Sequence, residues 1–227
     1  MGLDDLKREL GTELGTYAHY IQLEWASLKH TWQDWEAMFG ANQDRIDLLN
    51  EASDGFFFKV RVHFLHGTIL AIARLTDFPT TRVKGEVKDN LTIRALPDLC
   101  KTDNELKQKV EAVVEKAIEA AEPLKDYRNW KIGHNDKSLM LGDAKISGKV
   151  NREIISTAIA AIYQPIKIII ESKTGVECMT ELTGNVNNAK RLMYRLHSER
   201  EYYREFLEEV KNNSNRRPPD YPAWLND

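Results

Sequence analysis

The first forty residues carry apolar side chains at helical spacing. From residue 3 to residue 39 an apolar residue recurs every three or four positions, which is the period of an amphipathic α-helix of about 3.6 residues per turn. Gly11 and Gly15 weaken the prediction for the first turns. The stripe includes three tryptophans, Trp25, Trp32 and Trp35. We therefore expect one long helix whose tryptophans face a core and do not form a platform for nucleic-acid bases.

Further helices are predicted along the rest of the chain. The predicted elements are a central helix capped by Ser53 or Asp54 and ending before Pro79, a loop over residues 76–90, and a short helical piece from near Asn90 to before Pro97. The next predicted helix is capped by Thr102 or Asp103 and reaches Trp130, with a kink or a restart at Pro123. An irregular connection follows over residues 131–148. After it we expect a helix over roughly Val150–Lys173 that bends at Pro165. No internal repeat and no strand-like alternation stands out.

The final helix has a heptad pattern. Its apolar positions over residues 186–210 alternate in steps of three and four, which is typical of a coiled-coil seam. The seam could pack within the chain or pair two chains, and the pattern does not decide between them. The proline-rich tail over 216–227 is expected to be extended. The whole pattern predicts an all-α fold, an antiparallel bundle of long helices in a single domain over residues 1–215.

Composition narrows the function. The chain has 227 residues, 32 Lys and Arg against 35 Asp and Glu, and a net charge of −3, which excludes binding to nucleic acid through bulk positive charge. Cys100 and Cys178 lie far apart, so a disulfide scaffold or zinc ribbon is excluded and a reducing compartment is favoured. The first residues lack a signal-peptide pattern, and the apolar run over 154–166 is shorter than the ~20 residues that span a bilayer. We expect a cytoplasmic protein that does not bind a membrane.

Familiar metal and phosphate motifs are missing from the sequence. His63 and His66 are three residues apart on a helix, but no third metal ligand is evident, so we expect no metal and no cofactor. His63, His66 and Arg74 nevertheless form a polar stripe on an otherwise apolar helix, and such a stripe must face something polar.

An arginine followed by four to six residues and then a histidine occurs three times. In the pairs Arg61–His66 and Arg191–His197 the arginine is followed by an apolar residue within a continuous helical pattern, which indicates a structural role. Around Arg128 the context differs, because a polar residue follows it and Gly133 breaks the helix before the histidine. A guanidinium can bind phosphate oxygens, and an imidazole can transfer a proton near neutral pH, so this pair suits RNA cleavage without a metal.

The segment RNWKIGHND at 128–136 resembles the signature of the HEPN superfamily, in which an arginine, a polar residue and a later histidine form the active site of all-helical ribonucleases. RLTD at 74–77 is similar to a stretch in abortive-infection HEPN proteins of bacteria. The resemblance covers roughly residues 50–175 and leaves the first and last helices unplaced.

The resemblance implies a metal-independent endoribonuclease of a toxin or phage-defence system. It implies a homodimer in which two copies of the motif face one RNA backbone, and an antitoxin or neighbour-encoded protein is a possible partner. By position the resemblance gives Arg128 the phosphate-binding role, His134 the proton-transfer role and Asn129 an orienting role. We further expect Asp136 to hold the imidazole tautomer, with Arg74, His63 and His66 in the cleft wall and Lys131 adding positive charge.

Other functions remain open at this point. HEPN-like domains also serve as non-catalytic modules that bind a protein partner or a nucleotide, and the acidic balance suits protein contact as well as RNA contact. The polar stripe of the central helix could instead line a small-ligand pocket. The Arg128 segment could also be an exposed helix end whose cations complement the helix dipole.

Overall fold

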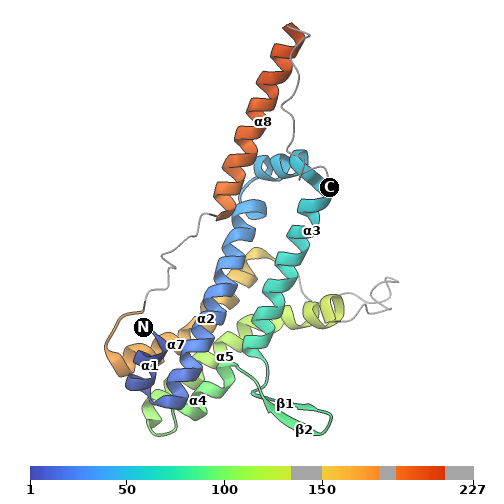
Figure 1. Ribbon diagram of the computed structural model, residues 1–227. Coiled ribbons are helices and arrows are strands. Elements are labelled where there is room, and N and C mark those ends of the chain that lie inside the picture. Colours follow the sequence, from blue (N-terminus) through green and yellow to red (C-terminus); the bar gives the residue numbers. More distant parts are fainter. Residues whose placement is uncertain (134–149, 179–187, 213–227) are drawn as a thin grey trace.

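The computed structural model describes residues 1–133, 150–178 and 188–212. The helices of the body are α1 (Leu3–Leu10), α2 (Thr12–Trp35), α3 (Gln43–Thr76), α4 (Leu96–Leu99), α5 (Asn104–Tyr127), α7 (Arg152–Thr174) and α8 (Asn188–Asn212). Shorter elements are the π-helical turns η1 (Glu36–Gly40) and η3 (Arg128–Gly133), the 3-10 turn η2 (Ile93–Ala95), and the strands β1 (Thr80–Val83) and β2 (Glu86–Asp89). The prediction of an all-α bundle of long helices is confirmed (Figure 1).

The main core lies where α2, α5 and α7 meet. Isoleucines of α7 face this core because they recur every three or four residues, and Ile155, Ile162, Ile166 and Ile169 are all at most 1% exposed. The α2 tryptophans Trp25 and Trp32 are each 3% exposed, so the prediction that they face the core is confirmed. By length and composition alone α3 and α7 could cross a bilayer, but core helices of soluble proteins pass the same test, and half of the apolar window of α7 is buried in this fold.

The single long N-terminal helix predicted from the sequence is wrong at Gly11. The chain breaks there because Gly11 adopts φ 84°, a conformation open to glycine, and α1 folds back onto α2. A Cβ on Gly15 would lie 2.5 Å from the carbonyl oxygen of Leu6, so the two backbones can approach this closely only with glycine at that position. The contact buries Leu6 completely.

The central helix begins earlier than predicted. Asn42 caps it by accepting a hydrogen bond from the Arg45 amide, and α3 then runs to Thr76. Ser53 keeps part of its predicted role, because its non-helical backbone angles divide α3 into two segments at that point. Just after this break the helix exposes two large apolar side chains, since Phe56 and Phe58 are 59% and 66% exposed.

The loop predicted over 76–90 contains an antiparallel hairpin. Strands β1 and β2 pair Thr80 with Asp89 and Val83 with Glu86, and the turn between them has positive φ at Lys84 and Gly85. The prediction missed it because all eight strand residues are exposed, so no alternation between buried and polar positions marks the strands. The Asn90 side-chain amide closes the base of the hairpin by donating to the carbonyl of Phe78 at 2.9 Å.

Among the prolines that the structure describes, three lie inside helices. Pro97 occupies the first turn of α4, where its missing N–H costs nothing, so the short helical piece does not end before it as predicted. α5 runs through Pro123, so the predicted restart at this residue is wrong. α7 likewise continues through Pro165. Asp103 is confirmed as the N-cap of α5, since it accepts from the Leu106 amide at 3.0 Å.

The heptad helix α8 begins by packing within the chain. Ala189 and Met193 join a second, smaller core formed with residues of η1 and α3, namely Met38, Phe39, Leu48, Leu49 and Phe57. Beyond these turns α8 projects from the body (Figure 1). Residue 186 and the tail over 216–227 lie outside the described residues, and the boundary near 215 stays a prediction.

Candidate functional site

Arg128 is the first residue of the π-helical turn that follows α5. Its Nη2 lies 3.4 Å from Oδ2 of Asp77, the residue that ends α3. The two side chains are 31% and 45% exposed, so the pair is reachable by solvent. Turns of π-helix inside helical segments are frequent at functional sites. The fold thus joins the RLTD stretch to the RNWKIG stretch, although 51 residues separate Arg128 from Asp77.

The donors of the Arg128 guanidinium are incompletely used. Its Nε is buried and has no hydrogen-bond partner among the described residues, and the contact with Asp77 is long for a hydrogen bond. A buried donor without an acceptor costs about 1–3 kcal/mol. An anion bound at this guanidinium would therefore be favoured electrostatically and by hydrogen bonding.

His66 contacts Tyr127, the residue that precedes Arg128 in the chain. The hydroxyl of Tyr127 and Nε2 of His66 are 3.5 Å apart, and the two rings meet edge to face. Burial, the neighbouring His63 and then Lys131 lower the pKa of His66, so its imidazole is neutral at pH 7. Burial also raises the pKa of Tyr127. Both shifts follow mainly from the partial burial of the two rings.

Arg74 pairs with α2 and lines a hollow. Its Nη2 lies 2.9 Å from a carboxylate oxygen of Glu24, and the arginine side chain is 71% exposed. The hollow has a volume of about 340 Å³ and is lined by Glu24, Arg74, Leu75, Asp77, Thr81, Asn90 and Leu91. Asp77 therefore borders the hollow and contacts Arg128, whereas His63 and His66 do not line it.

The other predicted site residues differ in what the structure describes. The Asn129 and Lys131 side chains are exposed. His134 and Asp136 lie outside the described residues, so the pairing of Arg128 with His134 stays a prediction. The prediction missed Asp77 and Tyr127 as site residues. Asp77 could have been found from the sequence, because it belongs to the RLTD stretch at residues 74–77. For Tyr127 the only indication in the sequence is that it precedes Arg128.

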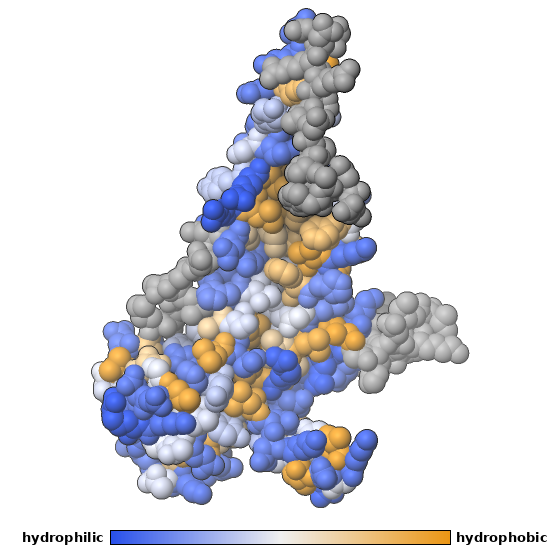
Figure 2. Space-filling model, viewed as in Figure 1, coloured by the Kyte–Doolittle hydropathy of each residue, from blue (hydrophilic) through white to orange (hydrophobic). Residues whose placement is uncertain are grey.

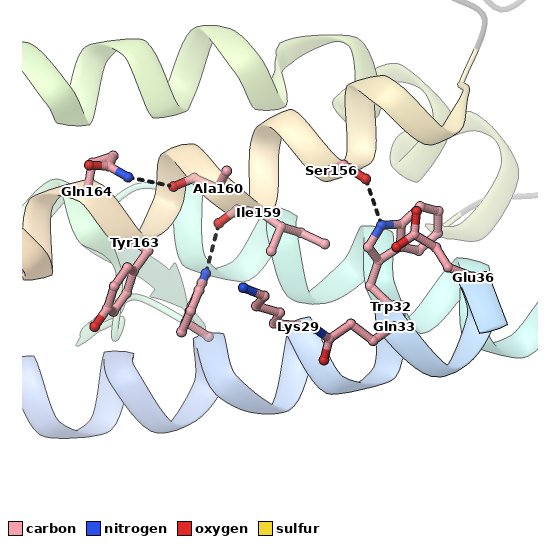
Figure 3. Close-up of a pocket in the computed structure, with 10 residues that line it drawn as sticks. Lys29, Trp32, Gln33, Glu36, Ser156, Ile159, Ala160, Tyr163 and Gln164 are labelled. Atoms are coloured by element: carbon pink, nitrogen blue, oxygen red, sulfur yellow. Dashed lines mark hydrogen bonds between the residues drawn. The ribbon is translucent and has the colours of Figure 1, made fainter. Parts of the chain in front are cut away.

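A second hollow, of about 450 Å³, lies between α2 and α7 (Figure 3). Its indole donors are occupied, because Trp25 donates to the carbonyl of Ile159 at 2.8 Å and Trp32 to the hydroxyl of Ser156 at 2.9 Å. Trp25 also stacks on Tyr163 with ring centroids 4.0 Å apart. These contacts hold α2 against α7, so this hollow is a weaker candidate site than the surroundings of Arg128.

The described residues offer no evident metal site. Within them no group of three His, Cys, Asp or Glu side chains could hold a metal ion. Burial raises the pKa of both cysteine thiols, so Cys100 and Cys178 are protonated near neutral pH. Neither is activated as a nucleophile.

The all-helical fold and the two motifs that meet at Arg128 define a protein of the HEPN class. The family model HEPN_AbiU2, described as AbiU2, matches residues 12–162, and the chain therefore belongs to this family of abortive-infection HEPN proteins. The match includes α2, whereas α8 lies outside it. No curated protein and no solved structure matches the chain.

Proposed function

We propose that this HEPN protein is a metal-independent endoribonuclease of an abortive-infection system. The observation that supports the proposal best is the environment of Arg128, a partly buried guanidinium in a π-helical turn, whose Nε has no hydrogen-bond partner among the described residues. His134 follows this turn directly in the sequence. The two residues supply the two functions that RNA cleavage without a metal requires.

The proposed chemistry is transfer of the phosphoryl group to the neighbouring ribose oxygen. Arg128 binds the non-bridging phosphate oxygens and stabilises the charge that grows on them. His134 moves a proton, either from the attacking 2′-hydroxyl or to the departing 5′-oxygen. The new P–O2′ bond replaces the P–O5′ bond, which leaves a cyclic phosphate and a free 5′-hydroxyl. In this scheme Asn129 orients the pair, and Asp136 holds the tautomer of His134.

Asp77 positions Arg128 before RNA binds. A partly exposed ion pair of this length is worth about 1 kcal/mol or less. A phosphate that binds through two parallel hydrogen bonds competes favourably with it. Asp77 therefore keeps the guanidinium in place without blocking exchange for the substrate.

The proposal includes the partners and the compartment. We propose single-stranded or loop RNA as the substrate, a homodimer that brings two copies of Arg128 to one backbone, and the cytoplasm as the location. An antitoxin encoded nearby is a possible partner. A dimer would also double the local positive charge of Arg128 and Lys131. RNA binding needs this charge, because the chain is acidic overall and Glu24 pairs with Arg74.

The test is cleavage of labelled RNA by purified protein in EDTA. Arg128→Ala and His134→Ala should each lower the rate on the order of 10²–10⁴-fold. The double variant of Arg191→Ala and His197→Ala is the matched control, because this pair has the same spacing on α8, and it should cut at the normal rate. The proposal fails if the first two variants cut as fast as the unaltered protein.

A non-catalytic module is the second candidate function. Carboxylates neutralise both Arg128 and Arg74 in the isolated chain, which favours a surface for a protein over one for RNA. Under this alternative a clean preparation never cuts RNA and instead binds a protein encoded next to it.

A further inference from the structure

The hollow that Asp77 borders lies where the body meets the hairpin. Glu24 of α2 and Arg74 of α3 line it from the body, and Thr81 and Asn90 line it from the base of the hairpin. The hairpin stands out from the body next to the end of α3 (Figure 1 and Figure 2). The volume of the hollow, about 340 Å³, is near the lower end of the range of roughly 300–1,000 Å³ for small-ligand sites. The hollow therefore has room for one part of a ligand, such as a single base of a nucleic acid.

Arg74 and Glu24 present donors and acceptors side by side. Nη2 of Arg74 donates to Oε2 of Glu24 at 2.9 Å, and the two side chains are 71% and 47% exposed. A guanidinium has about five N–H donors and a carboxylate has about four acceptor sites, so one mutual hydrogen bond leaves most of them for a ligand. The pair therefore offers a ligand an edge of donors that is followed directly by acceptors.

The rest of the rim of the hollow is rich in acceptors. The Asn90 amide donates to the carbonyl of Phe78 at 2.9 Å and to the hydroxyl of Thr81 at 2.6 Å, which uses both amide hydrogens and leaves the carbonyl oxygen of Asn90 as an acceptor. Asp77 adds a second carboxylate to that of Glu24. Among the described residues that line the hollow, Arg74 is the one cation. A ligand that fits this rim has N–H donors of its own and one group of acceptors for the arginine.

Guanine matches this order of groups. Its edge presents the acceptors N7 and O6 and then the donors N1–H and N2–H₂, and an arginine binds N7 and O6 through two parallel hydrogen bonds. A carboxylate accepts from N1–H and N2–H₂ in the same way. Adenine and uracil alternate acceptors and donors along their edges, and cytosine has one donor group where guanine has two. The pair of Arg74 and Glu24 thus complements guanine better than the other three bases.

We propose that the hollow binds a guanine base of the RNA, with Arg74 on N7 and O6 and Glu24 on N1 and N2. The inference rests on the proposed nuclease in one respect, which is that this guanine lies beside the phosphate that Arg128 binds. Asp77 connects the two positions, because it borders the hollow and its Oδ2 lies 3.4 Å from Nη2 of Arg128. Cleavage is therefore expected at one fixed position relative to a guanine.

The proposed contacts select unpaired RNA. O6, N1 and N2 of guanine are the groups that pair with cytosine in a duplex, so only a guanine in a single strand or a loop can offer them to the protein. Leu75 and Leu91 also line the hollow and give the flat face of the base an apolar surface. The hollow therefore adds a base preference to the single-stranded or loop RNA that is the proposed substrate.

The first test measures binding without cleavage. The probe is a fluorescent oligouridine that carries a single guanosine, and the full chain carries His134→Ala so that it does not cut the probe. Fluorescence anisotropy should show binding about tenfold or more tighter than to the same probe with adenosine or cytidine at that position. Inosine, which lacks the N2 amino group, should lose part of this preference. Adding Glu24→Gln or Arg74→Gln should abolish the preference while the circular dichroism spectrum stays that of the parent.

Glu36→Gln is the matched control. It also breaks a partly exposed ion pair of a glutamate near α2, since Oε1 of Glu36 lies 3.3 Å from Nε of Arg152. Glu36 is about 18 Å along the helix from Glu24, so its loss leaves the hollow intact. This variant should keep the guanine preference.

The second test maps where the unaltered chain cuts RNA of random sequence. The new ends should lie at one fixed position beside guanine, and Glu24→Gln should lower the rate at these sites about tenfold or more. A chain that cuts without base preference would overturn the inference and leave the nuclease standing, whereas a chain that binds guanine but cuts nothing would do the reverse. A preference for cytosine would also overturn the inference, as would a guanine preference that both Glu24→Gln and Arg74→Gln retain.

Discussion

Gly15→Ala tests the close approach of α1 to α2. The added Cβ would lie 2.5 Å from the Leu6 carbonyl oxygen, 2.6 Å from its carbon and 2.7 Å from Cα of Lys7. All three atoms belong to the backbone, so no side chain can rotate to make room. The only relief is a shift of α1 as a whole, by several tenths of an ångström or more, which disturbs the packing of the fully buried Leu6.

The magnitude follows from two opposing effects. Overpacking of this kind costs about 1–3 kcal/mol, and the loss of Leu6 burial bounds it at about 3 kcal/mol if α1 detaches. Alanine gains about 1 kcal/mol over glycine within a helix. We therefore expect the free energy of unfolding to fall by up to about 2 kcal/mol, and Tm by up to about 4–8 °C for a chain of this size.

Gly67→Ala is the matched control. Gly67 also lies inside a long helix, but a Cβ there would meet nothing within 4 Å, so only the propensity gain remains. The unfolding free energy should rise by about 0.5–1 kcal/mol. Urea denaturation at fixed pH, followed by circular dichroism, measures both variants. A Gly15→Ala protein at least as stable as the parent would refute the argument that glycine is needed for this contact.

Three further predictions concern single side chains. The pKa of His66 in the folded chain lies below its ordinary value of 6.5, because burial disfavours the charged imidazole. The contribution of His66 to the free energy of unfolding is therefore complete above pH 6.5 and is lost as the pH falls. In the His66→Gln variant the midpoint of urea denaturation should vary less between about pH 7.5 and pH 5. Asp103→Ala loses a helix cap and an ion pair, whereas Lys173→Ala loses only the ion pair, so the aspartate variant should show the lower Tm in calorimetry, and equal values would contradict this. Trp25→Phe removes a buried hydrogen bond but keeps an aromatic ring against Tyr163, so guanidinium titration should show a loss of about 1–3 kcal/mol; an unchanged midpoint would show that the bond contributes nothing.

The sequence by itself determined the helical class and some of the helix ends. Apolar spacing marks α2, α5 and α7 because one face of each is buried, and that burial requires a 3.6-residue period. Asp103 was recognisable as a cap because its carboxylate satisfies an amide within its own turn. The HEPN class was recognisable for a similar reason, since its residues are close together in the chain.

Only the tertiary structure decided which distant groups meet. Nothing local links Asp77 to Arg128, Tyr127 to His66 or Gly15 to Leu6, because each contact depends on how helices stack and not on the period of any one of them. The exposed hairpin escaped prediction because strands with no buried face have no pattern to read. The heptad pattern of α8 predicts a helix but does not identify what packs against it, because an apolar stripe favours burial against any apolar surface.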